Sequence, residues 1–157
     1  MFGVSGCGKT TIGIELAKEL GIPFYDADDF HPESNIQKMS KGTPLNDEDR
    51  QPWLEIISGQ INVWKKNEGA VIACSALKEN YRKILESENE KIVKWIFLDG
   101  SYSLIAKRME SRKNHFFKPS MLKSQFQALE KPNKGISIDI DNSIPNVITE
   151  IKSKLML

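Results

Sequence analysis

Residues 3–10 read G-V-S-G-C-G-K-T and match the pattern G-x-x-x-x-G-K-[ST] in full. A short apolar stub precedes them. A helical pattern follows, with one apolar face made of Ile12, Leu16, Ala17 and Leu20. Closely spaced glycines let backbone N–H groups converge on phosphate oxygens, and the following helix points its positive end at them. This strand–turn–helix order predicts a phosphate-binding loop within an α/β fold.

The loop residues are expected to take different roles. Lys9 would reach the β- and γ-phosphates of a nucleotide, and the Thr10 hydroxyl would hold Mg²⁺. A chance glycine turn before a helix is the alternative interpretation. For Cys7, a thiolate stabilised at a helix start competes with an ordinary variable loop position, and we favour the second. The candidate nucleotide site comprises Gly3, Val4, Ser5, Gly6, Cys7, Gly8, Lys9, Thr10 and Thr11.

Strand-like and helix-like segments alternate along the rest of the chain. A helix capped by Asn46 or Asp47 is expected to run to about Lys66. This alternation predicts a single α/β domain over residues 1–157, with a parallel sheet between two layers of helices. The expected strands lie at 22–25, 70–74, 92–98 and 136–138, and the other helices at 32–39, 78–86, 102–112, 121–130 and 147–155.

Only Met1 and Phe2 stand before the loop, where this kind of sheet usually has a strand of about five to six residues. A central strand that is too short exposes N–H and C=O groups on both neighbours and loses buried apolar side chains. We therefore expect the first strand to be truncated here, with the natural start a few codons upstream.

Asp26 and Asp28 follow the second strand-like run, at the sheet edge where open parallel sheets bind ligands. Residues two apart in an extended segment point the same way, so both carboxylates are expected to face the phosphate site. We assign Asp26 to the metal, and Asp28 to orienting and deprotonating an acceptor hydroxyl. The alternative for these residues is a structural role, in which an aspartate-rich turn only ends the strand. For Asp29 we expect no more than this structural role.

Composition limits the classes of partner. The formal net charge is +1, with 39% hydrophobic and 27% charged residues, so the chain carries no broad basic field for nucleic acid or an anionic membrane. No apolar run approaches the ~18–20 residues of a membrane span. Two cysteines without a metal-ligand pattern suggest reduced thiols, and we expect a cytoplasmic protein.

Taken together, several segments resemble the gluconate kinase family, a branch near the shikimate kinases. The phosphate loop alone fits hundreds of functions, but P-L-N-D-E-D-R-x-P-W combined with C-S-A-L-K-x-x-Y-R is much more specific. The resemblance implies a P-loop kinase fold with a lid, transfer of the ATP γ-phosphate to the 6-hydroxyl of D-gluconate, and a homodimer. The other matching segments are D-A-D-D-F-H-P at 26–32, N-I-Q-K-M at 35–39, R-K-N-H-F-F-K at 112–118 and Q-F-Q-A-L-E at 125–130.

Cationic residues favour an anionic, polyhydroxylated acceptor. We expect the Arg50 guanidinium to bind the carboxylate of the acceptor through two hydrogen-bond donors. An ion pair between Arg50 and Asp47 or Glu48 is the alternative. His31 would bind a sugar hydroxyl or cap the following helix. Trp53 is expected to pack in the core or at a subunit contact.

Further acceptor contacts are expected after the buried run that ends near residue 74. Ser75 and Lys78 follow this run at the ligand-binding edge, and Arg82 lies four residues after Lys78, on the same helical face. A solvated charge is the alternative for each cation. Gln125 is also assigned to the acceptor. The expected acceptor site comprises Asp28, His31, Arg50, Ser75, Lys78, Arg82 and Gln125.

Residues 107–123 form a basic segment, which suits a mobile lid at about 113–120. We expect Arg108 to stack on adenine and Arg112 to meet phosphate charge. Lys9, Asp28 and Arg112 would then be the catalytic residues. A kinase for another small acid such as shikimate, or a nucleotide-binding protein without catalysis, are the rival hypotheses.

Overall fold

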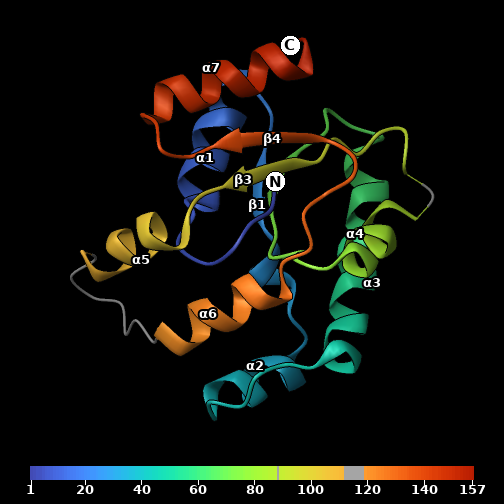
Figure 1. Cartoon of the computed structure of the whole chain (residues 1–157). Helices are drawn as coiled ribbons and strands as arrows, with labels where there is room; N and C mark the ends of the chain where they lie inside the picture. The colour runs from blue at the N-terminus through green and yellow to red at the C-terminus, as the bar shows by residue number, and fades with distance from the viewer. Residues whose placement is uncertain (88, 112–118) are drawn as a thin grey trace.

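The computed structural model describes residues 1–87, 89–111 and 119–157. The named strands are short and pair in parallel. β1 (Phe24–Asp26) pairs with β2 (Val71–Ala73), and β3 (Ile96–Asp99) pairs with β4 (Ile136–Asp139). Phe2 forms parallel bridges with Cys74, which follows β2, and with Phe97 of β3. The order across the sheet is therefore β1, β2, Phe2, β3 and β4 (Figure 1).

The central position is filled by Met1 and Phe2. The Phe2 N–H donates to Ile96 O at 2.8 Å, and the Leu98 N–H donates to Phe2 O at 2.9 Å. On the other side, the Cys74 N–H donates to Met1 O at 3.0 Å. Two residues therefore satisfy backbone groups of both neighbouring strands. That the natural strand is longer stays a prediction.

Helices cover both faces of the sheet. The side chains of β3 alternate, so that Ile96 and Leu98 join one apolar cluster while Phe97 joins another. The first cluster draws on α1 (Lys9–Leu20), α5 (Tyr102–Glu110) and α7 (Ile144–Leu155). The second draws on α3 (Asp47–Trp64) and α4 (Glu79–Glu86), on the other side of the sheet in Figure 1. This confirms the predicted three-layer α/β fold.

Local signals set the start of α3. The Asn46 side chain accepts from the Asp49 N–H at 2.8 Å, and the Asp49 carboxylate accepts from the Asn46 N–H at 2.9 Å. This capping box makes Asn46, rather than Asp47, the cap. Pro52 lies early in the helix, and Trp53 is fully buried, which confirms its predicted core position.

Three further elements lie toward the carboxyl edge of the sheet: the 3₁₀ turn η1 (Ala27–Phe30), α2 (Glu33–Ser40) and α6 (Pro119–Ala128). β3 begins four residues later than predicted, at Ile96. Among the helices that the structure describes, none combines the length and apolar character needed to cross a membrane.

Candidate active site

The loop between Phe2 and α1 has the conformation that its glycines allow. Gly6 has φ +82° and Gly8 has φ +97°, in the left-handed region that side chains rarely adopt. A Cβ on Gly6 would also lie 2.6 Å from Met109 Cγ. Gly8 caps α1, whose N-terminus therefore begins at the loop. Backbone N–H groups and the positive end of the helix together favour an anion here.

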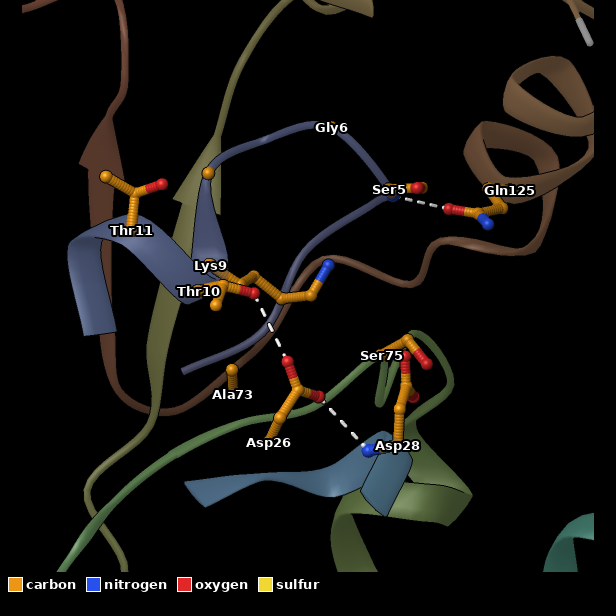
Figure 2. A pocket seen from close by; sticks show the side chains of 11 residues that line it. Ser5, Gly6, Lys9, Thr10, Thr11, Asp26, Asp28, Ala73, Ser75 and Gln125 are labelled. Atoms are coloured by element: carbon orange, nitrogen blue, oxygen red, sulfur yellow. Dashed lines mark hydrogen bonds between the residues drawn. The ribbon is translucent and has the colours of Figure 1, made fainter. Parts of the chain in front are cut away.

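Lys9 and Thr10 are the first two residues of α1, and their side chains line the cavity at the loop. The Lys9 Nζ donates to Gly3 O at 3.0 Å and to Val4 O at 3.1 Å, so its ammonium lies across the loop. The Thr10 hydroxyl donates to Asp26 Oδ2 at 3.2 Å, which links the loop to the end of β1 (Figure 2).

Cys7 contributes no reactive side chain to the site. Its side chain is fully buried in the cluster beneath the loop. Burial raises the pKa of the Cys7 thiol, although the neighbouring Lys9 charge acts in the opposite direction. The hypothesis of a stabilised thiolate is therefore wrong: Cys7 occupies a loop position, and its side chain packs in the core.

Asp26 and Asp28 face the loop, but not through an extended segment. Asp26 Oδ1 accepts from the Asp28 N–H at 3.1 Å and caps η1, so a 3₁₀ turn brings Asp28 round to the cavity (Figure 2). Desolvation within the cavity, and then the Asp26 charge, raise the pKa of the Asp28 carboxyl above its ordinary value, although the side chain is largely exposed. The predicted placement holds, although the predicted extended geometry was wrong.

Two cavities meet at this edge of the sheet. The first, of about 610 Å³, is lined by the phosphate loop, Asp26 and Asp28. The second, of about 690 Å³, lies beside α3 and α4. Ser75 and Gln125 line both cavities. Gln125 Oε1 accepts from the Ser5 N–H at 2.6 Å, so α6 contacts the phosphate loop directly (Figure 2).

The second cavity contains a polar cluster that includes a residue the sequence analysis missed. The Lys78 Nζ donates to Asp47 Oδ1 at 2.8 Å and to Oδ2 at 2.9 Å, and the Tyr81 hydroxyl donates to the same carboxylate. These hydrogen bonds, that from Lys78 first, lower the pKa of Asp47. The signal that could have found Tyr81 is its spacing of three residues from Lys78.

Arg50 lines the second cavity without a carboxylate partner among the residues that the structure describes. Its guanidinium carbon lies 6.0 Å from the centre of the Tyr81 ring. Asp47, the alternative partner considered for Arg50, is paired with Lys78 instead. The arginine charge is therefore directed to the cavity rather than to the start of its own helix.

Lys78 is the N-cap of α4, whereas Arg82 is a buried residue within this helix, and the predicted acceptor contact of Arg82 is corrected. Its guanidinium is buried and donates to Ala76 O at 2.9 Å, Leu77 O at 3.0 Å and Glu130 O at 3.0 Å. It is not among the residues that line either cavity. Arg82 therefore joins the loop before α4 to the segment after α6.

The remaining predicted site residues are His31, Arg108 and Arg112. The His31 ring stacks on Trp53, and its Nε2 lies 3.9 Å from Asp28 Oδ1. Arg108 donates to Ile140 O at 2.6 Å, in the segment after β4. Its proposed adenine contact stays a prediction. Arg112 and most of the predicted lid lie outside the described residues.

Comparison with known proteins agrees with this geometry. The family model for shikimate kinase matches residues 5–151. A thermosensitive gluconokinase from Escherichia coli (strain K12) is 45% identical over 99% of this chain and 86% of its own length. A probable gluconokinase from Dictyostelium discoideum is 45% identical over 96% and 82%, respectively.

Solved structures lead to the same family. The crystal structure of a gluconokinase from Sinorhizobium meliloti 1021 has a TM-score of 0.89 and 37% sequence identity. The match covers 99% of this chain and 89% of that one. The chain described here belongs to the gluconokinases, ATP-dependent kinases of the shikimate kinase family.

Proposed function

We propose that this chain transfers the γ-phosphate of ATP to the 6-hydroxyl of D-gluconate, giving 6-phospho-D-gluconate and ADP. The observation that carries the proposal is the junction of two cavities at Ser75 and Gln125. One cavity has a phosphate loop, and the other has an arginine suited to a carboxylate. Donor and acceptor can therefore meet between them.

Phosphate binding falls to the loop amides and Lys9. Phosphoryl transfer depends mainly on positioning and charge neutralisation, which these groups supply. Thr10 and Asp26 fit Mg²⁺, because their hydroxyl and carboxylate oxygens lie 3.2 Å apart and this ion takes few protein ligands beside phosphate and water. When bound, Mg²⁺ neutralises phosphate charge.

Asp28 is the proposed general base. Its carboxylate lines the phosphate cavity beside Ser75 and remains open to solvent there. The raised pKa makes Asp28 a better proton acceptor than an ordinary aspartate. It would orient the acceptor hydroxyl and take its proton as the new P–O bond forms.

The acceptor carboxylate is assigned to Arg50. Because Lys78 is already paired with Asp47, its charge is largely compensated within the cluster. Arg50 is left to bind the carboxylate, while Lys78 and Tyr81 offer polar contacts to hydroxyl groups. Ser75 and Gln125 would contact the acceptor where the cavities join.

The other expectations remain part of the proposal. Arg112 would stabilise the transferring phosphoryl group, Arg108 would contact adenine, and a lid at about 113–120 would exclude water. The resemblance implies a homodimer, and the two cysteines without a metal-ligand pattern favour a cytoplasmic location. The net charge of +1 gives no support for a nucleic-acid or membrane partner.

The test is ADP release measured with gluconate, with shikimate and without an acceptor. Gluconate alone should stimulate release. Equal turnover of both acids would contradict the acceptor assignment, and acceptor-independent hydrolysis alone would favour a protein without kinase activity. A substitution tests the base role: Asp28→Asn should lower kcat by about 10²-fold or more while ATP still binds. Asp29→Asn, at an exposed neighbouring position, is the matched control. Near-normal turnover in Asp28→Asn would move the base role to Asp26.

A further inference from the structure

Asn35 of α2 is only 3% exposed and has a fixed orientation. Its Nδ2 donates to the backbone carbonyl of Asp49 at 2.8 Å. A carbonyl oxygen only accepts hydrogen bonds, so the amide nitrogen of Asn35 must face it. The same nitrogen lies 3.3 Å from Nδ1 of His31, where its second hydrogen is available.

This contact determines the tautomer of His31. If Nδ1 accepts a hydrogen bond from Asn35, the ring proton of a neutral imidazole must be on Nε2. Nε2 is the nitrogen that faces Asp28 Oδ1, at 3.9 Å. Burial, and more weakly the charge of Arg50, lower the pKa of His31, while Asp28 acts in the opposite direction. The neutral ring therefore presents an N–H toward the carboxylate.

The plane of the ring is also fixed. Only 5% of the His31 side chain is exposed, and the ring stacks on Trp53 with centroids 4.4 Å apart and planes at 14°. Trp53 is itself fully buried, and its indole N–H donates to Ala27 O at 2.7 Å. Ala27 lies between Asp26 and Asp28. Trp53, on which the imidazole stacks, is therefore hydrogen-bonded to the backbone segment that carries both carboxylates.

We propose that His31 is a positioning residue for Asp28, with Asn35 selecting the tautomer that makes it one. A small rotation of the Asp28 side chain would bring its Oδ1 from 3.9 Å to within hydrogen-bond distance of the His31 Nε2–H. One carboxylate oxygen is then held by Nε2–H, and the other is left to accept the proton of the acceptor hydroxyl. The inference rests on the proposed base role of Asp28.

This role differs from the direct acceptor contact first expected of His31. The residues that line the two cavities include Asp28 but not His31, within the part of the chain that the structure describes. The imidazole lies behind the carboxylate, with both ring nitrogens directed at protein atoms. Its effect should therefore appear in turnover rather than in acceptor affinity.

Two substitutions separate the N–H from the aromatic ring. His31→Phe keeps a ring to stack on Trp53 but removes both nitrogens, whereas His31→Gln keeps an N–H donor near the Nε2 position. A general base contributes about 10²–10⁴-fold, and we expect His31→Phe to lower kcat by about tenfold while both KM values stay within about twofold. His31→Gln should recover most of that loss.

The kinetic outcomes are decisive in either direction. A raised gluconate KM with unchanged kcat in His31→Phe would mean direct contact with the acceptor and would overturn the inference. Unchanged kinetics in a folded His31→Phe would reduce the residue to packing. If wild type shows no gluconate-dependent ADP release, the proposed function fails first. If wild type is active with gluconate and His31→Phe has the same kcat, the positioning role alone is refuted and the proposed function stands.

Nitrogen-15 NMR of the wild-type imidazole tests the tautomer without any loss of folding. The chain has two histidines, and the signal lost in His31→Phe assigns the relevant one. A neutral Nε2–H tautomer at pH 7 is expected. An Nδ1–H tautomer or an imidazolium would overturn the inference. Asn35→Asp, which removes the amide donor, should shift a folded protein toward Nδ1–H and lower kcat; an unchanged tautomer would remove Asn35 from the proposal.

Discussion

Replacing Arg82 with methionine should destabilise the fold without weakening acceptor binding. The Arg82 side chain is 4% exposed, and its guanidinium donates to three backbone carbonyls, those of Ala76, Leu77 and Glu130, and to the carboxylate of Glu79 at 2.8 Å. Methionine keeps much of the aliphatic stem but leaves these acceptors without their donor. The hydrogen bonds are charge-assisted and shielded from solvent, so their loss is costly.

The size of the effect follows from this burial. Breaking a buried, hydrogen-bonded charge network costs about 3–5 kcal/mol, which is a large part of the ~5–15 kcal/mol stability of a domain. In a chain of this length 1 kcal/mol lowers the melting temperature by roughly 2–4 °C, so a decrease of roughly 6–20 °C is expected. Lys83→Met, at an exposed position of the same helix, is the matched control and should change little.

The assay combines urea unfolding with steady-state kinetics at a temperature where the variant is folded. We expect a lower unfolding midpoint and a gluconate KM close to that of wild type. A KM raised by about tenfold, or 1.4 kcal/mol, with an unchanged midpoint would place Arg82 in the acceptor site and refute the structural argument.

Arg50→Lys should raise the gluconate KM and leave the ATP KM unchanged, because lysine keeps the charge but not the planar pair of donors; an unchanged gluconate KM would contradict the carboxylate assignment. Burial raises the pKa of Cys7, and it raises that of Cys74 to about 12, so thiolate is scarce at pH 8 and iodoacetamide should modify neither thiol before unfolding. Rapid labelling of the folded protein would contradict this burial. Gly13→Ala should lower the melting temperature, since its Cβ would lie 2.5 Å from an aromatic ring of β1, whereas Gly59→Ala in α3 meets open space and should raise it. Equal shifts in the two variants would mean that the ring moves aside.

The features predicted best from sequence depend on local patterns. The phosphate loop was found because its glycines and the start of α1 are adjacent in the chain, and the helix beginning after Asn46 has a local cap. Asp26 and Asp28 were placed correctly for a partly wrong reason, because a side-chain hydrogen bond to the backbone turns the chain where an extended segment was expected.

The features missed from sequence depend on contacts between distant segments. The donors of Arg82 reach Glu130 O, 48 residues away, and Lys78 reaches Asp47, 31 residues away. Helical spacing alone could not tell a buried guanidinium from an exposed one. Asn35 was also overlooked, because an asparagine in a short polar helix gives no sign that its amide is buried against a carbonyl of α3.

The bridge at Phe2 has a consequence for how the protein opens. Its ring packs against Phe97 and Trp95, while its backbone lies between the two strand pairs. Every pairing in the sheet is non-local, so folding is expected to be slow for a domain of this size. Since the amides of Cys74 and Leu98 donate to residues 1 and 2, they exchange with deuterium only when the sheet separates at its centre. These two amides should therefore report the cooperative opening of the two halves of the sheet, and not local fraying.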